Sequence, residues 1–270
     1  MWEGTLIETE DYTTIIDVSQ WQGVVDWEQV KPHISGAIIR ISQKYDGNYH
    51  TAYDDYFNRN CLECERLGIP YGVYLFSNAT SLETAQKEAQ FALNAVKDRK
   101  LSFPIFFDSE DRSTADYAHD CAIEFLRIIE EAGYPAGVYA STSWWLAHTR
   151  DIAKYNWIAA WGKNTGEPDW SKYPTASDIW QYTSNGSIPG ISGRVDMSLS
   201  WLKYQEPDYG FKVGQKVMVK KEARRSNGKK FLWFVYKSLY IVKEITKDYA
   251  IIKGLIFSIK IENKDNLFLV

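Results

Sequence analysis

Two carboxylates stand two positions apart at the end of a short apolar run, Ile105-Phe106-Phe107-Asp108-Ser109-Glu110. A run of this length, led by Phe103-Pro104, is typical of a buried strand rather than a helix. On a strand, residues i and i+2 point to the same face, roughly 6–7 Å apart at about 3.3 Å per residue. Like charges held this close raise the pKa of one partner, which suits acid/base chemistry. The alternative is a polar strand end that enters a loop, and these six residues alone do not decide between the two.

Two further aspartates, Asp17 and Asp196, close predicted strands. If the strands form a barrel, the first and the last are neighbours, and chemistry takes place at the carboxyl ends of the strands. These aspartates, Asp108 and Glu110 would then meet at one mouth, where a pair of carboxyl groups can cleave a glycosidic bond. Four carboxylates can instead hold a metal ion. We rank that lower because no His lies at these strand ends, and we predict neither a metal nor a cofactor.

The barrel is predicted from strands that alternate with amphipathic segments between residues 13 and 202. The strands are expected at 13–18, 36–41, 71–76, 103–110, 137–140, 157–160, 179–182 and 194–197. Helical patterns cover 51–67, 81–98 and 115–131, and the second begins with the N-cap signature Ser81-Leu82-Glu83. This alternation favours parallel βα units, and eight of them favour a closed, TIM-like α/β barrel. The later connections are too short for full helices, so we expect the second half of the barrel to be irregular.

Aromatic residues are the main candidates for binding a ligand at this mouth. They make up 15% of the chain, with 11 Trp and 18 Tyr, and such a surplus suits a cleft that stacks on sugars or bases. The candidates at predicted strand ends are Tyr74, Tyr139, Trp161 and Tyr182. The alternative for each is packing in the barrel core. Arg40 ends the second strand, where it could pair with a site carboxylate or form a structural salt bridge.

The overall composition is that of a soluble globular protein, with 45% hydrophobic and 24% charged residues. No apolar stretch approaches the ~20 residues of a membrane span. Residues 1–8 are acidic and lack the features of a signal peptide. We therefore expect synthesis in a cytoplasm and release by another route, or a signal already removed. Cys61, Cys64 and Cys121 are expected to be reduced thiols, because no second Cys/His pair stands at zinc spacing.

The charge is divided unevenly along the chain. Residues 208–270 hold 14 Lys/Arg and 6 Asp/Glu, a net charge of +8, whereas residues 1–207 hold 17 and 29, a net charge of −12. Residues 206–208 are interpreted as a linker, and the tail beyond them as a small all-β barrel or sandwich. Its short strands are expected at 213–219, 231–236, 240–245, 249–253 and 268–270. A basic surface attracts polyanions such as nucleic acid, anionic lipid or an anionic cell-wall polymer.

The motifs of the chain resemble those of glycoside hydrolase family 25, the lysozymes also called muramidases. Its opening motif is similar to Ile16-Asp17-Val18-Ser19-Gln20-Trp21-Gln22-Gly23. Further matches follow in order at Gly72-Val73-Tyr74, Asp108-Ser109-Glu110, Trp157-Ile158-Ala159, Ile179-Trp180-Gln181-Tyr182-Thr183, Ile188-Pro189-Gly190-Ile191 and Val195-Asp196. The resemblance covers roughly residues 14–202. Two departures stand out: Leu75 replaces a common His, which is expected to alter the cleft wall, and Trp161 replaces a common Tyr.

The resemblance implies cleavage of the β-1,4 bond between N-acetylmuramic acid and N-acetylglucosamine in peptidoglycan. It implies Glu110 as the general acid, with its pKa raised by the like charge of Asp108. Asp17, Asp108 and Asp196 would stabilise positive charge on the sugar, or position its acetamido group or a water. An Asp-x-Glu pair also allows a substrate-assisted route, so the stereochemical outcome stays open.

The tail resembles bacterial SH3-like cell-wall modules, with a structural cap on the barrel as the alternative. We therefore predict an N-terminal extension at 1–13, a catalytic barrel at 14–205 and an SH3-like wall-binding domain at 206–270. The whole is interpreted as a phage endolysin of a Gram-positive host, acting at the wall after release, with peptidoglycan and anionic wall polymers as partners and no nucleic acid. The alternatives are a chitinase- or glucosaminidase-like hydrolase and a non-catalytic wall-binding lectin.

Overall fold

The chain folds into two compact units, Met1–Gln205 and Glu206–Val270. The computed structural model describes residues 5–45, 50–205, 211–225, 227–246, 249–255, 257–262 and 266–270. The predicted linker at 206–208 and the first four residues of the predicted N-terminal extension lie outside these ranges.

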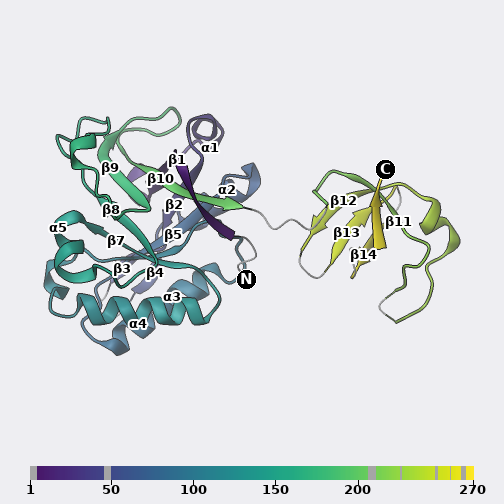
Figure 1. Cartoon of the computed structure of the whole chain (residues 1–270), viewed down its shortest axis with the longest axis horizontal. Coiled ribbons are helices and arrows are strands. Elements are labelled where there is room, and N and C mark those ends of the chain that lie inside the picture. Colours follow the sequence, from purple (N-terminus) through teal and green to yellow (C-terminus); the bar gives the residue numbers. More distant parts are fainter. Residues whose placement is uncertain are drawn as a thin grey trace. The chain divides into compact units, whose positions relative to one another are not determined.

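The first unit is a closed barrel with the strand order β1-β10-β9-β8-β7-β6-β5-β2 (Figure 1). Its strands are β1 (Thr5–Val18), β2 (Gly36–Arg40), β5 (Tyr71–Phe76), β6 (Ile105–Asp108), β7 (Ala136–Ser141), β8 (Tyr155–Ala159), β9 (Ile179–Gly186) and β10 (Val195–Gln205). They overlap the eight predicted strands. The predicted architecture, an irregular α/β barrel followed by a small all-β unit, is confirmed.

The last strand of the barrel runs in the opposite direction to the one expected. β10 pairs antiparallel with both β9 and β1, whereas the other neighbours pair in parallel. A parallel return needs a crossover of a dozen residues or more, and only residues 187–194 separate β9 from β10. β1 also begins at Thr5 rather than at residue 13, and residues 5–8 pair with 202–205 before a register shift.

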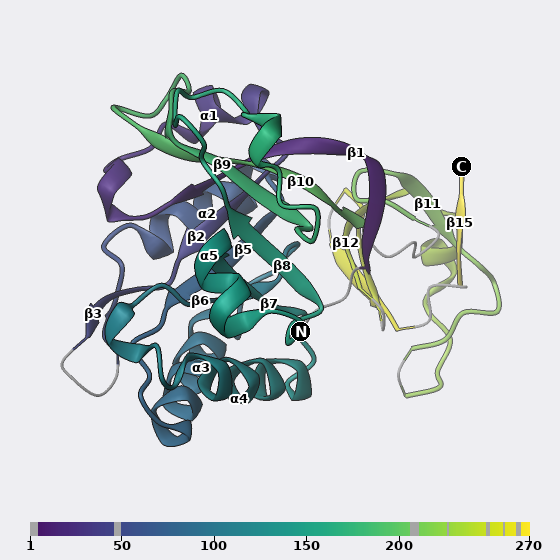
Figure 2. The same cartoon turned by 60° about the vertical axis from the view of Figure 1, so that its left-hand side comes forward.

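The helices lie outside the barrel, where Figures 1 and 2 both show α3 and α4 side by side. The elements are α1 (Trp27–Val30), α2 (Phe57–Leu67), α3 (Leu82–Val96), α4 (Ala118–Glu131) and α5 (Thr142–Trp144). The predicted cap of α3 is present, because Thr84 N donates to Ser81 Oγ (3.2 Å). The helix predicted from residue 51 begins only at Phe57, because β3 (Ser42–Tyr45) and β4 (His50–Tyr53) form a hairpin before it.

Alternation along the strands divides the apolar residues between an outer and an inner layer. On β6, Ile105 and Phe107 belong to the outer layer, which includes residues of the helices, whereas Phe106 packs inside the barrel against Trp157 (ring centroids 5.3 Å apart). Room for Phe106 depends on Gly137, where a Cβ would lie 2.5 Å from the Phe106 ring. Since successive strand residues face opposite sides, Asp108 shares the inward face with Phe106.

The second unit is a five-stranded antiparallel sheet in the order β14-β13-β12-β11-β15. The strands are β11 (Lys216–Val219), β12 (Tyr240–Ile245), β13 (Ala250–Lys253), β14 (Ser258–Ile261) and β15 (Leu267–Leu269). Where a strand was predicted at 231–236, the chain forms a 3₁₀ helix, η6 (Trp233–Lys237). The periodicity of a short apolar run does not distinguish a strand from a helical segment, which explains the error. β14 was missed.

Within the described ranges, no helix is both long and apolar enough to cross a membrane.

Candidate active site

A cavity of about 230 Å³ opens at the barrel mouth. Its lining comprises Asp17, Arg40, Tyr74, Phe76, Asp108, Glu110, Tyr139, Trp157, Trp161, Gln181, Ser184 and Asp196. The structure therefore brings all four predicted carboxyl groups together, as well as Arg40 and three of the four predicted aromatic residues.

Asp17 and Asp196 face each other across two antiparallel strands. Asp17 lies two residues after Ile15, which packs inside the barrel, and its register partner on β10 is Asp196. Because β10 is antiparallel, Asp196 lies at the amino end of its strand, not at the carboxyl end as expected. Strand polarity changes which end of β10 reaches the mouth, but the register still pairs the two carboxyl groups.

Three contacts hold the Asp108-Ser109-Glu110 segment where β6 ends. Ser77 N donates to Asp108 O (2.9 Å), and Ser109 N donates to Tyr139 O (2.9 Å), so the flanking strands fix the backbone. Trp144 Nε1 donates to the buried Ser109 hydroxyl (2.9 Å). The strand ends at Asp108, and Glu110 lies just beyond it, yet both side chains line the cavity.

Burial is the main influence on the pKa values of Asp108 and Glu110. It raises the pKa of Glu110 to about 7, and the second cause is the charge of Asp196. Burial, followed by the charge of Glu110, raises the pKa of Asp108 well above its ordinary value, and Arg40 opposes this shift. The like charge that raises the pKa of Glu110 is that of Asp196 rather than that of Asp108, the source expected from the sequence.

Asp17 and Asp196 share a hydrogen bond and titrate differently. Burial and then the charge of Asp196 raise the pKa of Asp17 well above its ordinary value. Burial raises the pKa of Asp196 to about 6, against the lowering effect of the hydrogen bond from Asp17. Asp17 is therefore the partner that carries the shared proton, and Asp196 is the carboxyl group that ionises more readily.

Gln181 connects three residues of the mouth and was not among the predicted site residues. Its Nε2 donates to Asp17 Oδ2, while its Oε1 accepts from Tyr139 OH and from Trp161 Nε1, each at 2.9 Å. One feature of the sequence, the inward and outward alternation along a strand, could have identified Gln181. Ile179 packs inside the barrel, so the residue two positions later also faces inward.

Two buried polar atoms at this mouth lack partners among the residues that the structure describes, namely Arg40 Nε and Asp108 Oδ1. Buried polar atoms are usually hydrogen-bonded. The Arg40 guanidinium lies over the Phe76 ring, 5.6 Å from its centroid. These two unpartnered atoms are available to a ligand or to water.

Comparison with known proteins gives the family. Residues 16–191 match the family model of Glycosyl hydrolases family 25. The chain belongs to this family. The match ends before Asp196, which the barrel closure nevertheless brings to the mouth.

Three relatives illustrate the similarity. Lysozyme M1 of Streptomyces globisporus is 29% identical over 204 residues, covering 67% of this chain and 65% of that protein. The lysozyme of Streptococcus phage Cp-9 is 27% identical over 135 residues, covering 46% and 40%. The structure of the modular autolysin LytC from Streptococcus pneumoniae, in complex with a synthetic peptidoglycan ligand, has a TM-score of 0.59 and 30% identity, covering 74% and 48%. The chain thus spans less than two thirds of the length of each.

The departures from the family 25 pattern have little effect on the cavity. Leu75 belongs to the outer layer beneath the helices, so it does not alter the cleft wall, contrary to expectation. Trp161 is 39% exposed at the mouth and keeps a hydrogen-bond donor through its indole N–H.

Tyr182 is the one predicted site residue that the structure does not bring to the cavity. It packs with Trp180 and Leu199 outside the barrel, where its hydroxyl lies 3.5 Å from Met197 Sδ. It follows Gln181 directly and therefore faces the opposite side of the strand.

No cluster of three or more His, Cys, Asp or Glu side chains suited to a metal ion occurs in the part of the chain that the structure describes.

Proposed function

We propose that this family 25 protein hydrolyses the β-1,4 bond between N-acetylmuramic acid and N-acetylglucosamine in peptidoglycan. The observation that carries the proposal is one cavity in which Glu110, with a pKa of about 7, stands beside Asp196, with a pKa of about 6. Near neutral pH a large fraction of Glu110 is protonated while most of Asp196 is ionised. Glycosidic cleavage needs one proton donor and one carboxylate of this kind.

Glu110 is proposed as the general acid. It protonates the leaving oxygen of the glycosidic bond as the C–O bond breaks, and a raised pKa keeps that proton available at neutral pH. The contacts around Ser109 support this role, because they fix the segment that carries Glu110.

Asp196 is proposed to supply the negative charge that opposes the positive charge developing at the sugar, or to orient the acetamido group or a water. Asp17 shares its proton with Asp196 and so stabilises this anion. Asp108, whose pKa is raised by burial and by the charge of Glu110, is proposed as a hydrogen-bonding group for the sugar. This assignment gives separate roles to the three aspartates, which the sequence left undivided between stabilising positive charge and positioning the acetamido group or a water.

Sugar binding is proposed for Trp161, Tyr74, Tyr139 and Arg40. Trp161 offers a partly exposed ring at the rim, a surface on which a sugar face can stack. The unpartnered Arg40 Nε and Asp108 Oδ1 are suited to bind the hydroxyl or amide groups of a bound sugar.

We further propose that residues 14–205 form the catalytic domain, that residues 206–270 form an SH3-like wall-binding domain, and that the chain is a phage endolysin of a Gram-positive host. The similarity to the lysozyme of Streptococcus phage Cp-9 supports the endolysin part of this proposal. The similarity to the autolysin solved with a peptidoglycan ligand supports a wall substrate. The positive net charge of the tail supports attraction to anionic wall polymers.

The experiment is a digest of purified walls followed by identification of the new reducing ends. New reducing muramic acid supports the proposal. Reducing glucosamine would instead indicate a glucosaminidase, and binding without new ends would indicate a lectin. The lectin alternative is less favoured because both carboxyl groups of the acid pair are present and line the cavity.

A further inference from the structure

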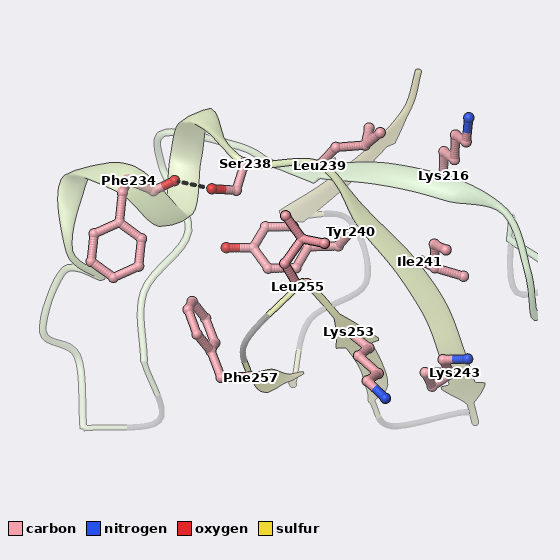
Figure 3. Close-up of a pocket in the computed structure, with 11 residues that line it drawn as sticks. Lys216, Phe234, Ser238, Leu239, Tyr240, Ile241, Lys243, Lys253, Leu255 and Phe257 are labelled. Carbon is pink, nitrogen blue, oxygen red and sulfur yellow. Dashed lines mark hydrogen bonds between the residues drawn. The ribbon is translucent and has the colours of Figure 1, made fainter.

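A second depression, of about 890 Å³, lies entirely within the second unit and is not used by the proposed hydrolysis (Figure 3). It combines aliphatic side chains, three aromatic rings and three lysines. They are Leu239, Ile241, Leu255, Phe234, Tyr240, Phe257, Lys216, Lys243 and Lys253. We propose that this depression, here called the lysine pocket, binds a wall polymer of phosphodiester-linked polyols.

Sheet register places two of the lysines, Lys216 and Lys253, in one row on the outward face. Lys216 on β11 pairs with Ile241 on β12, and Ile241 pairs with Lys253 on β13. Directly paired residues share a face of the sheet. At about 4.8 Å per strand, the two lysines lie about 10 Å apart with Ile241 between them. Lys243 follows on β12, and Figure 3 shows it next to Lys253.

The three ammonium groups are not neutralised by any of the described residues. Across the residues that the structure describes, none of the three forms an ion pair. Other cations of this unit lie over aromatic rings, as Lys237 does over Trp233 (5.6 Å) and Lys260 over Tyr249 (4.0 Å). The lysine pocket therefore presents free positive charge around an apolar centre.

The hydroxyl of Tyr240 is a second sign of a missing ligand. Tyr240 is 1% exposed, and among the described residues its hydroxyl has no partner in hydrogen-bonding geometry. The Ser238 hydroxyl donates to Phe234 O (2.8 Å) and lies close enough to lower the pKa of Tyr240, but the two hydroxyls do not meet the geometry of a hydrogen bond. Figure 3 shows the Tyr240 hydroxyl directed into the space beside Phe234 and Ser238. A buried polar atom of this kind is normally satisfied.

The lysine pocket has two positive charges separated by an apolar surface. A polyol phosphate chain has the complementary repeat, because its anionic phosphodiesters are separated by C–H-rich units. A nucleic acid would also need open rings for base stacking. Here Tyr240 is buried, Phe234 is half-buried and packs edge to face against Phe257 (5.8 Å, 73°), and Phe257, 38% exposed, is the one partly open ring among the three. The choice of a wall polymer among polyanions rests on the function proposed for the first unit.

The test measures binding of the full-length chain to soluble poly(glycerol phosphate). We expect binding to weaken about tenfold or more in the triple variant Lys216→Gln, Lys243→Gln and Lys253→Gln. Each exposed ion pair with a phosphate contributes modestly, and the triple variant loses three of them. The matched control combines Lys221→Gln, Lys229→Gln and Lys230→Gln, which removes the same charge from exposed positions outside the pocket. This control should bind almost as the wild type does.

Tyr240→Phe extends the test to the pocket interior. It should weaken binding by roughly threefold to tenfold without lowering Tm, since the hydroxyl that it removes forms no hydrogen bond in good geometry with the described residues. Equal losses in both lysine triples would overturn the proposal in favour of diffuse charge. Tighter binding of a single-stranded oligonucleotide of equal charge would overturn it in favour of nucleic acid, and absence of polymer binding by the wild type would also overturn it.

Hydrolysis of polymer-free peptidoglycan, measured in parallel, should be unchanged in every variant, so failure of the hydrolase proposal would be seen separately.

Discussion

At the scale of single residues, the site depends on how four carboxyl groups share protons. The sequence indicates which residues these are, because each lies at or beside the end of an apolar strand. It does not indicate their protonation, which depends on burial and on neighbours from distant strands. Asp108 is adjacent to Glu110 in sequence, yet Asp196 is the second influence on the pKa of Glu110.

These shifts predict a narrow pH optimum. Glu110 acts in its protonated form with a pKa of about 7, so kcat/KM on walls should fall above that pH. Asp196 acts as an anion with a pKa of about 6, so the rate should also fall below that value. A pH–rate profile on isolated walls checks this, with the two limbs belonging to the coupled cluster as a whole. A rate that continues to rise to alkaline pH would contradict the assignment.

The same shift predicts that the general acid lowers stability. The folded-state pKa of Glu110 lies above its ordinary value of 4.5, so its contribution to stability is present at acid pH and is lost as pH rises to about 7. Above that pH, Glu110→Gln should raise the free energy of unfolding by on the order of 2–3 kcal/mol. Urea unfolding at pH 8 and pH 4 measures this difference, which should shrink at the lower pH. Equal stability of both proteins at pH 8 would argue against burial of the charge.

At the scale of elements, inward and outward alternation decides which side chains reach the cavity. This rule was available from the sequence, and it places Asp17, Arg40, Tyr74 and Asp108 correctly. Applied strictly, it would also have selected Gln181 over Tyr182. The direction of β10 and the hairpin before α2 were less accessible, because both depend on how short connections fold against the rest of the barrel.

The alternation gives a matched pair of variants on β9. Gln181→Met leaves the Tyr139 hydroxyl, the Trp161 indole N–H and Asp17 Oδ2 without a shared partner. It should lower the free energy of unfolding by about 1–3 kcal/mol and reduce kcat. Tyr182→Phe, at the next position but outside the cavity, should leave kcat nearly unchanged. Thermal unfolding and initial rates compare the two, and a larger loss of activity in Tyr182→Phe would reverse the assignment of faces.

At the scale of the whole molecule, two units differ in charge and in architecture. The net charges of −12 and +8 indicate separate modules, and the composition shift near residue 207 lies close to the division after Gln205. The strands of the second unit were less predictable, because its short aromatic segments do not distinguish a strand from the turn formed by η6.

Removal of residues 206–270 tests this division. The truncated chain should hydrolyse soluble glycan fragments at an unchanged rate, since the cavity lies wholly in the first unit. On intact walls it should act roughly tenfold or more slowly, because the second unit no longer raises the local concentration. Turbidity loss of walls and release of soluble products measure the two rates. Equal rates on intact walls would favour a structural cap.

The most direct test of the central claim compares reducing ends released from the same walls by three proteins. The wild type should release reducing muramic acid, and Glu110→Gln should lose activity by about 10²–10⁴-fold while still binding walls. Glu167→Gln, which makes the same change at an exposed carboxylate outside the cavity, should act as the wild type does. Retention of most activity by Glu110→Gln, or release of reducing glucosamine by the wild type, would contradict the account.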